Sequence, residues 1–177
     1  MENNHYPVWK QALNFGLILS LAMILLSLLW YILDLSTNKA VGYVGYAVLL
    51  AGIIISEINY RDRKLGGYIT YGKSLSTGFL TGLFASIIVG IYTFIYFTVI
   101  APEMVDILIR AAEDNMIEKS PDLTDDQLDM AMNMTRKMMT PLGMSFWATL
   151  SNIFFSLIFA LIVSIFVRKD PNTISEA

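Results

Sequence analysis

One acidic side chain lies well inside an apolar stretch of this sequence and could carry ion chemistry. Glu57 is the only ionisable residue well within a predicted membrane span, and carboxylates in such places serve as ion or proton sites. Arg61 follows four residues later, in the favourable order for an ion pair on one helix face. Two interpretations therefore stay open: a Glu57–Arg61 salt bridge near the membrane surface, or an ion-binding carboxylate.

Methionine is concentrated in a second candidate segment. Met130, Met134 and Met138 share one face of a predicted helix, and their soft thioethers could hold Cu(I). Met132 and Met139 point elsewhere on such a helix, so the methionines do not form a single site. Methionine is also common at helix interfaces and partner-binding surfaces. We expect the first three to form an apolar stripe that is buried within the protein or contacts a partner. Extracytoplasmic Cu(I) sensing is a weaker alternative.

Enzyme chemistry has little support in this sequence. The chain has no cysteine, and its one histidine, His5, precedes every predicted helix. We find no paired carboxylates that would face a common cavity and no nucleophile elbow. The acidic residues of segment 114–129 lack the spacing and the glycine of a calcium loop. We therefore expect no catalytic residue, no cofactor and no metal site.

Composition indicates that lipid surrounds most of the chain, which we interpret as a single membrane domain. Of its 177 residues 55% are apolar and only 15% are charged, and the mean hydropathy is +0.57. A net charge of -3 provides no basic surface for nucleic acid. Each of four apolar stretches is close to or above the length of about 20 residues that a bilayer requires. The predicted spans cover residues 11–33, 40–58, 74–100 and 142–167.

The distribution of positive charge predicts the orientation of these spans. Four cations lie in the loop 61–73, and Arg168 and Lys169 follow the last span. Cytoplasmic loops carry such an excess, so both termini are predicted to be cytoplasmic, with residues 168–177 as a flexible tail. The segment 102–140 then lies on the outer side as an amphipathic helical hairpin that either projects from the membrane or lies in its interface. Its second helix begins at a capping box, Thr124 to Gln127.

Small side chains form a ridge on each of the last two spans. Such ridges let helix backbones approach closely in lipid, so we expect spans three and four to face each other. We also expect the Asn152 side chain to bond to span three near Ser86 or at a neighbouring carbonyl. The ridge of the third span consists of Ser74, Gly78, Gly82, Ser86 and Gly90. The ridge of the fourth span consists of Ala148, Asn152, Ser156, Ala160 and Ser164.

A glycine- and tyrosine-rich motif opens the third span. It is either a tight turn with two anchoring tyrosines, or a re-entrant segment whose backbone amides bind an anion. The motif consists of Gly66, Gly67, Tyr68, Ile69, Thr70, Tyr71 and Gly72. With this motif, the small-residue span after it and the outer proline, the chain resembles a Bacteroidetes-type family of four-span proteins catalogued as domain of unknown function four-one-nine-nine. The resemblance implies a location in the inner membrane and supplies no activity, substrate or catalytic residue.

These patterns favour an all-α integral membrane protein, an antiparallel four-helix bundle with an extracytoplasmic hairpin between spans three and four. Our first interpretation is a non-enzymatic accessory or scaffold subunit of a homo-oligomer or a larger membrane complex. The alternative is transport of a small molecule, lipid or ion by a protein that can work as a dimer. Glu57, Asn152 and the 66–72 motif would then line a path. A polar cavity reaching mid-bilayer would favour transport, and a dry bundle would count against it.

Overall fold

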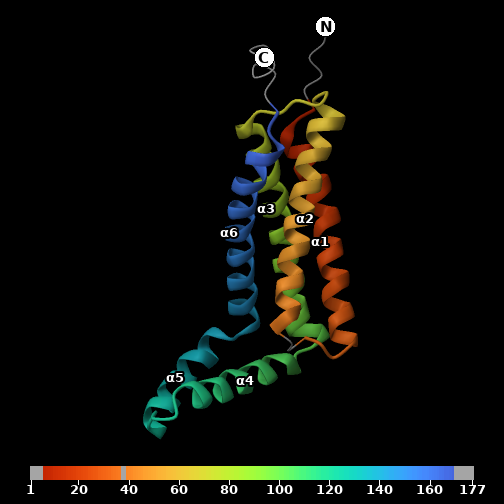
Figure 1. Cartoon of the computed structure of the whole chain (residues 1–177). Coiled ribbons are helices and arrows are strands. Elements are labelled where there is room, and N and C mark those ends of the chain that lie inside the picture. The colour runs from red at the N-terminus through yellow and green to blue at the C-terminus, as the bar shows by residue number, and fades with distance from the viewer. Residues whose placement is uncertain (1–5, 37–38, 170–177) are drawn as a thin grey trace. The chain divides into compact units, whose positions relative to one another are not determined.

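The computed structural model describes residues 6–36 and 39–169, which are helical for most of their length. Two π-helical turns extend the second and third helices at their C-terminal ends: η1 (Tyr60–Lys64) and η2 (Tyr96–Ile100). Figure 1 shows the helices α1 (Val8–Ile32), α2 (Lys39–Asn59), α3 (Tyr71–Ile95), α4 (Glu103–Lys119), α5 (Asp125–Met138) and α6 (Pro141–Val167).

Four of the helical segments are long and apolar enough to cross a membrane, which confirms the expected number of spans. They are Val8–Ile32, Ala40–Lys64, Tyr71–Ile100 and Pro141–Val167. A helix satisfies its backbone hydrogen bonds within one segment, which is what a chain in hydrocarbon requires. The second segment runs six residues past the predicted end at 58, because η1 continues the helix through Lys64.

The chain divides into two compact units. The bundle unit consists of Met1–Val89 and Leu150–Ala177, and the middle unit consists of Gly90–Thr149. The boundaries fall within α3 and α6, so the middle unit contains the end of α3 and the start of α6 in addition to α4 and α5. It is thus larger than the predicted insert 102–140.

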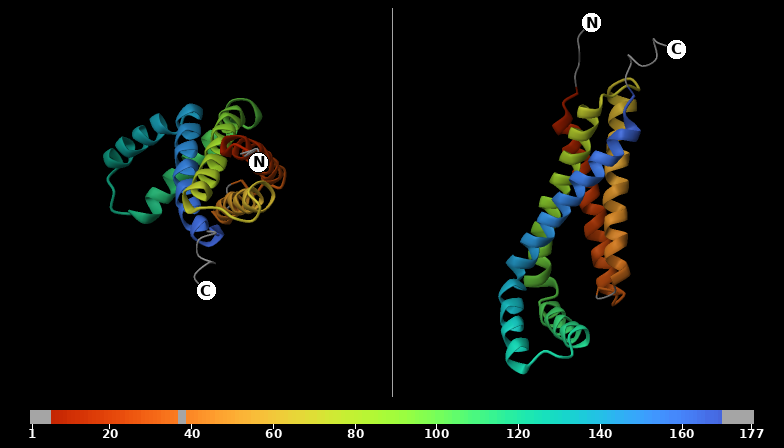
Figure 2. Two further views of the ribbon diagram at one scale, coloured as in Figure 1. Left: turned by 90° about the horizontal axis from the view of Figure 1, so that it is seen from above. Right: turned by 60° about the vertical axis from the view of Figure 1, so that its left-hand side comes forward.

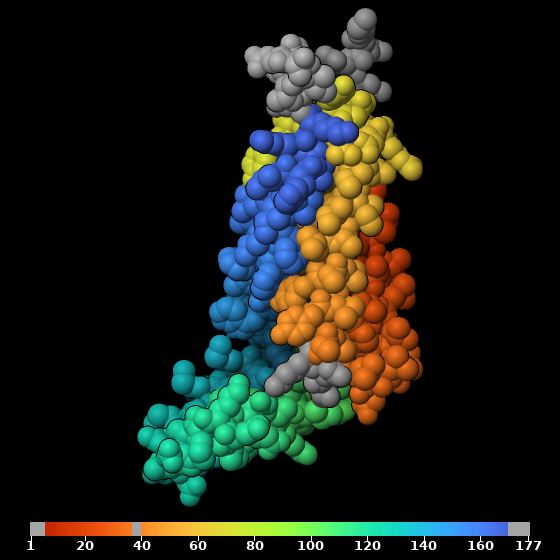
Figure 3. All heavy atoms as spheres, in the orientation of Figure 1, coloured from red at the N-terminus to blue at the C-terminus, as the bar shows by residue number. Residues whose placement is uncertain are grey.

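In the bundle unit, α1 and α2 lie side by side in both views of Figure 2. The chain can change direction at the end of α1, because Asp34 adopts a left-handed conformation with φ 55°. The amides of Asp34 and Leu35 then donate to the carbonyls of Tyr31 (3.2 Å) and Trp30 (2.8 Å), which is a Schellman motif. Helices α2 and α6 lie against each other on the face shown in Figure 3. Between them, the centroids of the Tyr46 and Phe155 rings are 4.5 Å apart.

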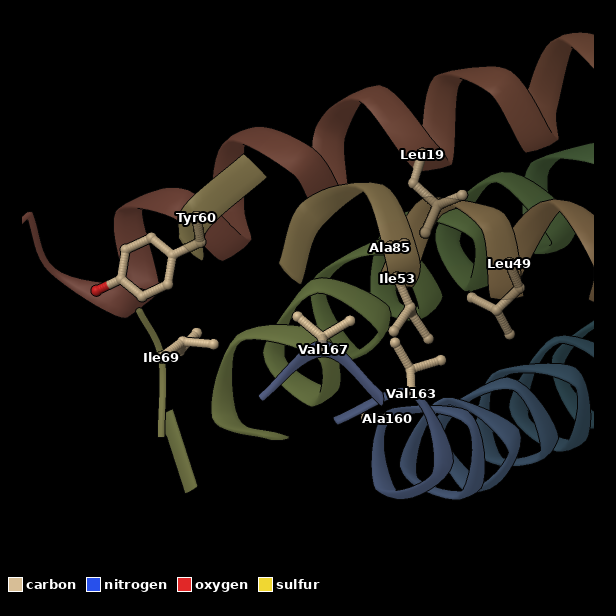
Figure 4. Packing of buried hydrophobic residues seen from close by; sticks show 9 residues of the cluster. All are labelled: Leu19, Leu49, Ile53, Tyr60, Ile69, Ala85, Ala160, Val163 and Val167. Atoms are coloured by element: carbon tan, nitrogen blue, oxygen red, sulfur yellow. The ribbon is translucent and has the colours of Figure 1, made fainter. Parts of the chain in front are cut away.

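The apolar core of the bundle unit joins all four of its helices and the loop before α3. Figure 4 shows its buried members, which come from α1, α2, η1, the loop, α3 and α6. They are Leu19, Leu49, Ile53, Tyr60, Ile69, Ala85, Ala160, Val163 and Val167.

In the middle unit, Ala101 interrupts the helical run, as expected for a residue that precedes a proline. Its φ and ψ of -142° and 63° are not helical, and Pro102 then precedes α4. The predicted capping box is confirmed, because the Thr124 hydroxyl accepts from the Gln127 amide and the Gln127 side chain accepts from the Thr124 amide. Helices α4 and α5 contact each other, and Met132 is the buried residue of α5.

Part of the predicted tail is ordered. Lys169 exchanges two backbone hydrogen bonds with Ile69, of 2.9 and 3.0 Å, so the chain just beyond α6 is fixed to the loop before α3. The remaining predicted tail, 170–177, lies outside the described residues, as do 37 and 38 of the turn between the first two spans.

Candidate functional site

The carboxylate of Glu57 joins three helices of the bundle unit. Glu57 lies in the last turn of α2 and is fully buried, with 0% of its surface exposed. The Ser74 hydroxyl, near the start of α3, donates to Glu57 Oε2 at 2.5 Å. The Ser164 hydroxyl, near the end of α6, donates to the same oxygen at 3.1 Å. One carboxylate oxygen therefore receives a hydrogen bond from each of two neighbouring helices.

The other carboxylate oxygen has no such partner. Glu57 Oε1 is buried without a hydrogen bond from any residue that the structure describes. It lies against Gly78, where an added Cβ would overlap it unless the carboxyl group moved, so the glycine allows this close approach. Burying a charged oxygen without a partner is costly, and natural proteins rarely retain such a group without a functional reason.

The expected Glu57–Arg61 ion pair is not formed. The Arg61 guanidinium instead binds its neighbour Asp62, with Nε to Oδ1 at 2.7 Å and Nη2 to Oδ2 at 3.1 Å. Its Nη1 donates to the Val167 carbonyl at 3.0 Å. The cause lies between the two residues, because the π-helical turn that starts at Tyr60 has more residues per turn and changes the face on which Arg61 lies. Spacing alone could not reveal this change.

A second set of polar side chains surrounds Ser56, the residue before Glu57, and includes α1. The Ser56 and Thr81 hydroxyls are 2.8 Å apart, which links α2 to α3. The Gln11 side chain in α1 donates to Asn59 Oδ1 at 3.1 Å and to the Ser56 carbonyl at 3.5 Å. Gln11, Ser56 and Thr81 are buried, so this end of the bundle has a polar interior.

The motif 66–72 closes this end of the bundle. Gly66 and Gly67 have positive φ angles of 69° and 94°, which confirms the predicted turn. Ile69 is 2% exposed and is held by Lys169 through the backbone bonds described above. Figure 4 shows its side chain near Tyr60, whose hydroxyl donates to the Tyr6 carbonyl at 2.7 Å. Ile69 and Lys169 are far apart in the sequence, so no local pattern predicts this pairing of the loop with the end of α6.

The small-residue ridges are partly in contact with each other. In the bundle unit, a Cβ on Gly82 would overlap the Ser156 side chain, and in the middle unit a Cβ on Gly90 would overlap the Thr149 side chain. The predicted bond from the Asn152 side chain to the third span is wrong. The Ser86 hydroxyl donates to the Gly82 carbonyl of its own helix at 2.6 Å, and no bond from the half-buried Asn152 side chain to Ser86 or to a neighbouring carbonyl of α3 is found among the described residues.

The methionine stripe of α5 faces outward. Met130, Met134 and Met138 are 72%, 66% and 51% exposed, which corrects the possibility that they are buried within the protein. Met132 is 4% exposed and takes the interior position instead. The methionines thus point to different sides of α5. Among the described residues there is also no group of three or more His, Cys, Asp or Glu side chains that could hold a metal ion.

Four apolar helices with a polar interior define a multi-pass membrane protein. The chain belongs to a family of proteins of unknown function, DUF4199, whose family profile matches residues 14–169. The match includes Glu57, both of its serine partners and the whole middle unit. No curated protein and no solved structure matches the chain.

Proposed function

We propose that this protein is a non-enzymatic accessory or scaffold subunit of a bacterial inner membrane. Its four helices cross the bilayer as an antiparallel bundle with both termini in the cytoplasm, and the segment 102–140 forms a helical hairpin on the outer side. The cations of the loop 61–73, together with Arg168 and Lys169, support this orientation by the positive-inside rule. The bonded pair Ile69 and Lys169 supports a common side for both groups of cations.

The observation that carries this proposal is the exposure of Met130, Met134 and Met138 on α5. They form an apolar stripe on an otherwise strongly polar helix, which has Asp125 and Asp126 in its first turn. Flexible thioether side chains adapt to a partner surface, and methionine is enriched at protein interfaces. The stripe therefore fits a contact with another membrane protein or with a second copy of this chain.

Cross-linking in native membranes tests the contact. The chain has no cysteine, so Met134→Cys provides a single attachment point for a short photoactivated cross-linker. We expect one discrete adduct, at twice the mass of the chain for a second copy or at another fixed mass for a different protein. The adduct should disappear when Met130 and Met138 are both changed to Ser, because the partner then loses its apolar contact.

Asn133→Cys is the matched control, since Asn133 is exposed on the same helix outside the stripe. It should give much less of the adduct. Equal amounts of adduct from both positions would indicate random collision. If the cross-linker on Met134→Cys reacted only with lipid, the stripe would lie in the membrane interface. Either result contradicts the proposed subunit contact.

Ion transport is the second candidate, and the buried carboxylate of Glu57 favours it. A transporter would show ion flux in proteoliposomes that Glu57→Gln abolishes, whereas a scaffold would show no flux with either chain. The close packing of Gly78 against Glu57 leaves little room for a larger solute.

A further inference from the structure

Glu57 combines three features that together indicate a bound ligand. It is fully buried, its Oε1 lacks a hydrogen-bond partner among the described residues, and its Oε2 receives hydrogen bonds from two hydroxyls. Two neutral donors at one oxygen do not replace the hydration that a carboxylate loses in a bundle surrounded by lipid. The second oxygen therefore needs a positively charged ligand.

The cations of the protein do not supply that charge. Arg61 is held by Asp62 and by the Val167 carbonyl, and within the described residues no salt bridge reaches Glu57. The Lys64 ammonium lies 4.4 Å from the centroid of the Tyr6 ring, over its face. Other charged or titratable groups on the elements packed near this end come from all four helices and the loop before α3. They are Lys10 over Trp9 on α1, Tyr60 and Arg63 on η1, Tyr68 in the loop, Tyr71 and Lys73 at the start of α3, and Arg168 and Lys169 after α6.

The space around Oε1 selects the size of the ligand. Gly78 lies against this oxygen so closely that a Cβ added there would overlap it unless the Glu57 carboxyl group moved, and the Ile53 side chain packs against the same position. A metal cation needs several oxygen ligands around it, about six for the common hard cations. Neither Gly78 nor Ile53 has a side-chain oxygen. A proton needs one lone pair and no coordination shell.

We propose that Glu57 is a proton-binding site that is loaded when α2, α3 and α6 are packed together. A proton from the aqueous phase adds to a lone pair of Oε1 and forms an O–H bond, and no other covalent bond forms or breaks. Release of the proton leaves a charge within this interface, so unloading requires the three helices to separate or water to enter. This inference goes beyond the accessory role, and it names the ion that the transport candidate would bind.

Carbodiimide labelling of the full-length protein in detergent and in liposomes tests the site. Dicyclohexylcarbodiimide enters apolar regions and reacts with protonated carboxyl groups, and the resulting N-acylurea is located by peptide mass spectrometry. We expect labelling at Glu57 that falls as the pH is raised and that sodium does not change. In parallel, infrared spectroscopy should show the carbonyl stretch of a neutral carboxylic acid, and this band should be lost in Glu57→Gln.

Glu57→Gln is the appropriate variant because its amide has nearly the shape of the protonated acid and should preserve folding, which gel filtration verifies. Asp62→Asn is the matched control, since Asp62 is an exposed acid five residues further along, and it should retain both the label and the band. If sodium suppressed the labelling at constant pH, the ligand of Glu57 would be a metal cation and not a proton. A band unchanged in Glu57→Gln, or no neutral carboxylic acid band in the unsubstituted protein, would overturn the proposal. These readouts require neither a partner nor ion flux, so they can fail independently of the proposed function.

Discussion

The bundle unit and the middle unit distribute polarity in opposite ways. In the part of the chain that the structure describes, every buried polar side chain except Ser145 belongs to the bundle unit. The middle unit instead buries Met104 and Met132 within α4 and α5, while most of the charged residues of these helices are exposed. Lipid gives apolar side chains no reason to leave the surface, so helices in lipid associate through close packing and polar contacts. Helices α4 and α5 follow the pattern of helices that have water on one side.

The largest effect is expected where the bundle unit packs most tightly. Gly82→Ile would force a side chain into the position that the Ser156 Cβ and hydroxyl occupy, and the two helices would have to move apart. Overpacking of this kind destabilises by about 3 kcal/mol. The measurement is the free energy of unfolding in mixed micelles. Gly42→Ile is the control, because no atom lies within 4 Å of a Cβ added there. Equal losses from the two variants would show that α3 and α6 do not pack at Gly82.

The sequence was sufficient for features that depend on local composition. The four apolar runs, the break at Ala101 before Pro102, the positive φ of Gly66 and Gly67, and the Thr124 cap all follow from residues within a few positions of one another. Each is determined by backbone sterics or by the cost of leaving backbone groups without a hydrogen bond, either at a helix end or in lipid. Such features can be recognised in a single sequence.

The partners of Glu57 could not be predicted in this way. The i to i+4 spacing favoured Arg61, but the π-helical turn at Tyr60 redirects that side chain to Asp62. The actual donors, Ser74 and Ser164, are 17 and 107 residues away from Glu57 in the sequence. The spacing of small residues indicates only that these two serines belong to packing ridges. The rotation of each helix about its axis decides which ridge residue contacts the carboxylate. An apolar run does not determine this rotation, because nearly every face of the helix is apolar.

A smaller effect tests the interior of the middle unit. Met132→Ala removes a side chain that is 4% exposed, and truncation of a buried methionine costs about 2 kcal/mol. Met134→Ala is the control on the same helix, where 66% of the side chain is exposed and the change should stay within about 0.5 kcal/mol. Hydrogen exchange over 103–138 can measure both. A larger loss for Met134→Ala would mean that α5 is rotated and that its exposed stripe is part of the core.

The hydroxyls that bind Glu57 should each contribute less than the methionine. Ser74→Ala or Ser164→Ala removes one donor to Oε2, and hydrogen bonds between membrane helices contribute about 1 kcal/mol. Ser76→Ala is the control, because it changes an exposed serine of α3, and it should leave the free energy of unfolding unchanged. If the double variant lost no more than either single variant, the two serines would act as one unit with the carboxylate.

The smallest effect is expected at Asn152. It distinguishes the predicted bond between Asn152 and Ser86 from the observed bond between Ser86 and Gly82. A buried bond to Ser86 would make Asn152→Leu costly, because the Ser86 hydroxyl would lose its acceptor. In the structure that hydroxyl donates to the Gly82 carbonyl, so the substitution should change the free energy of unfolding by less than about 0.5 kcal/mol. Asn152→Leu also replaces a half-buried amide by an apolar side chain, which lipid tolerates. A loss above about 1 kcal/mol, reproduced by Asn152→Ala, would mean that this amide joins the polar interior that now includes Glu57.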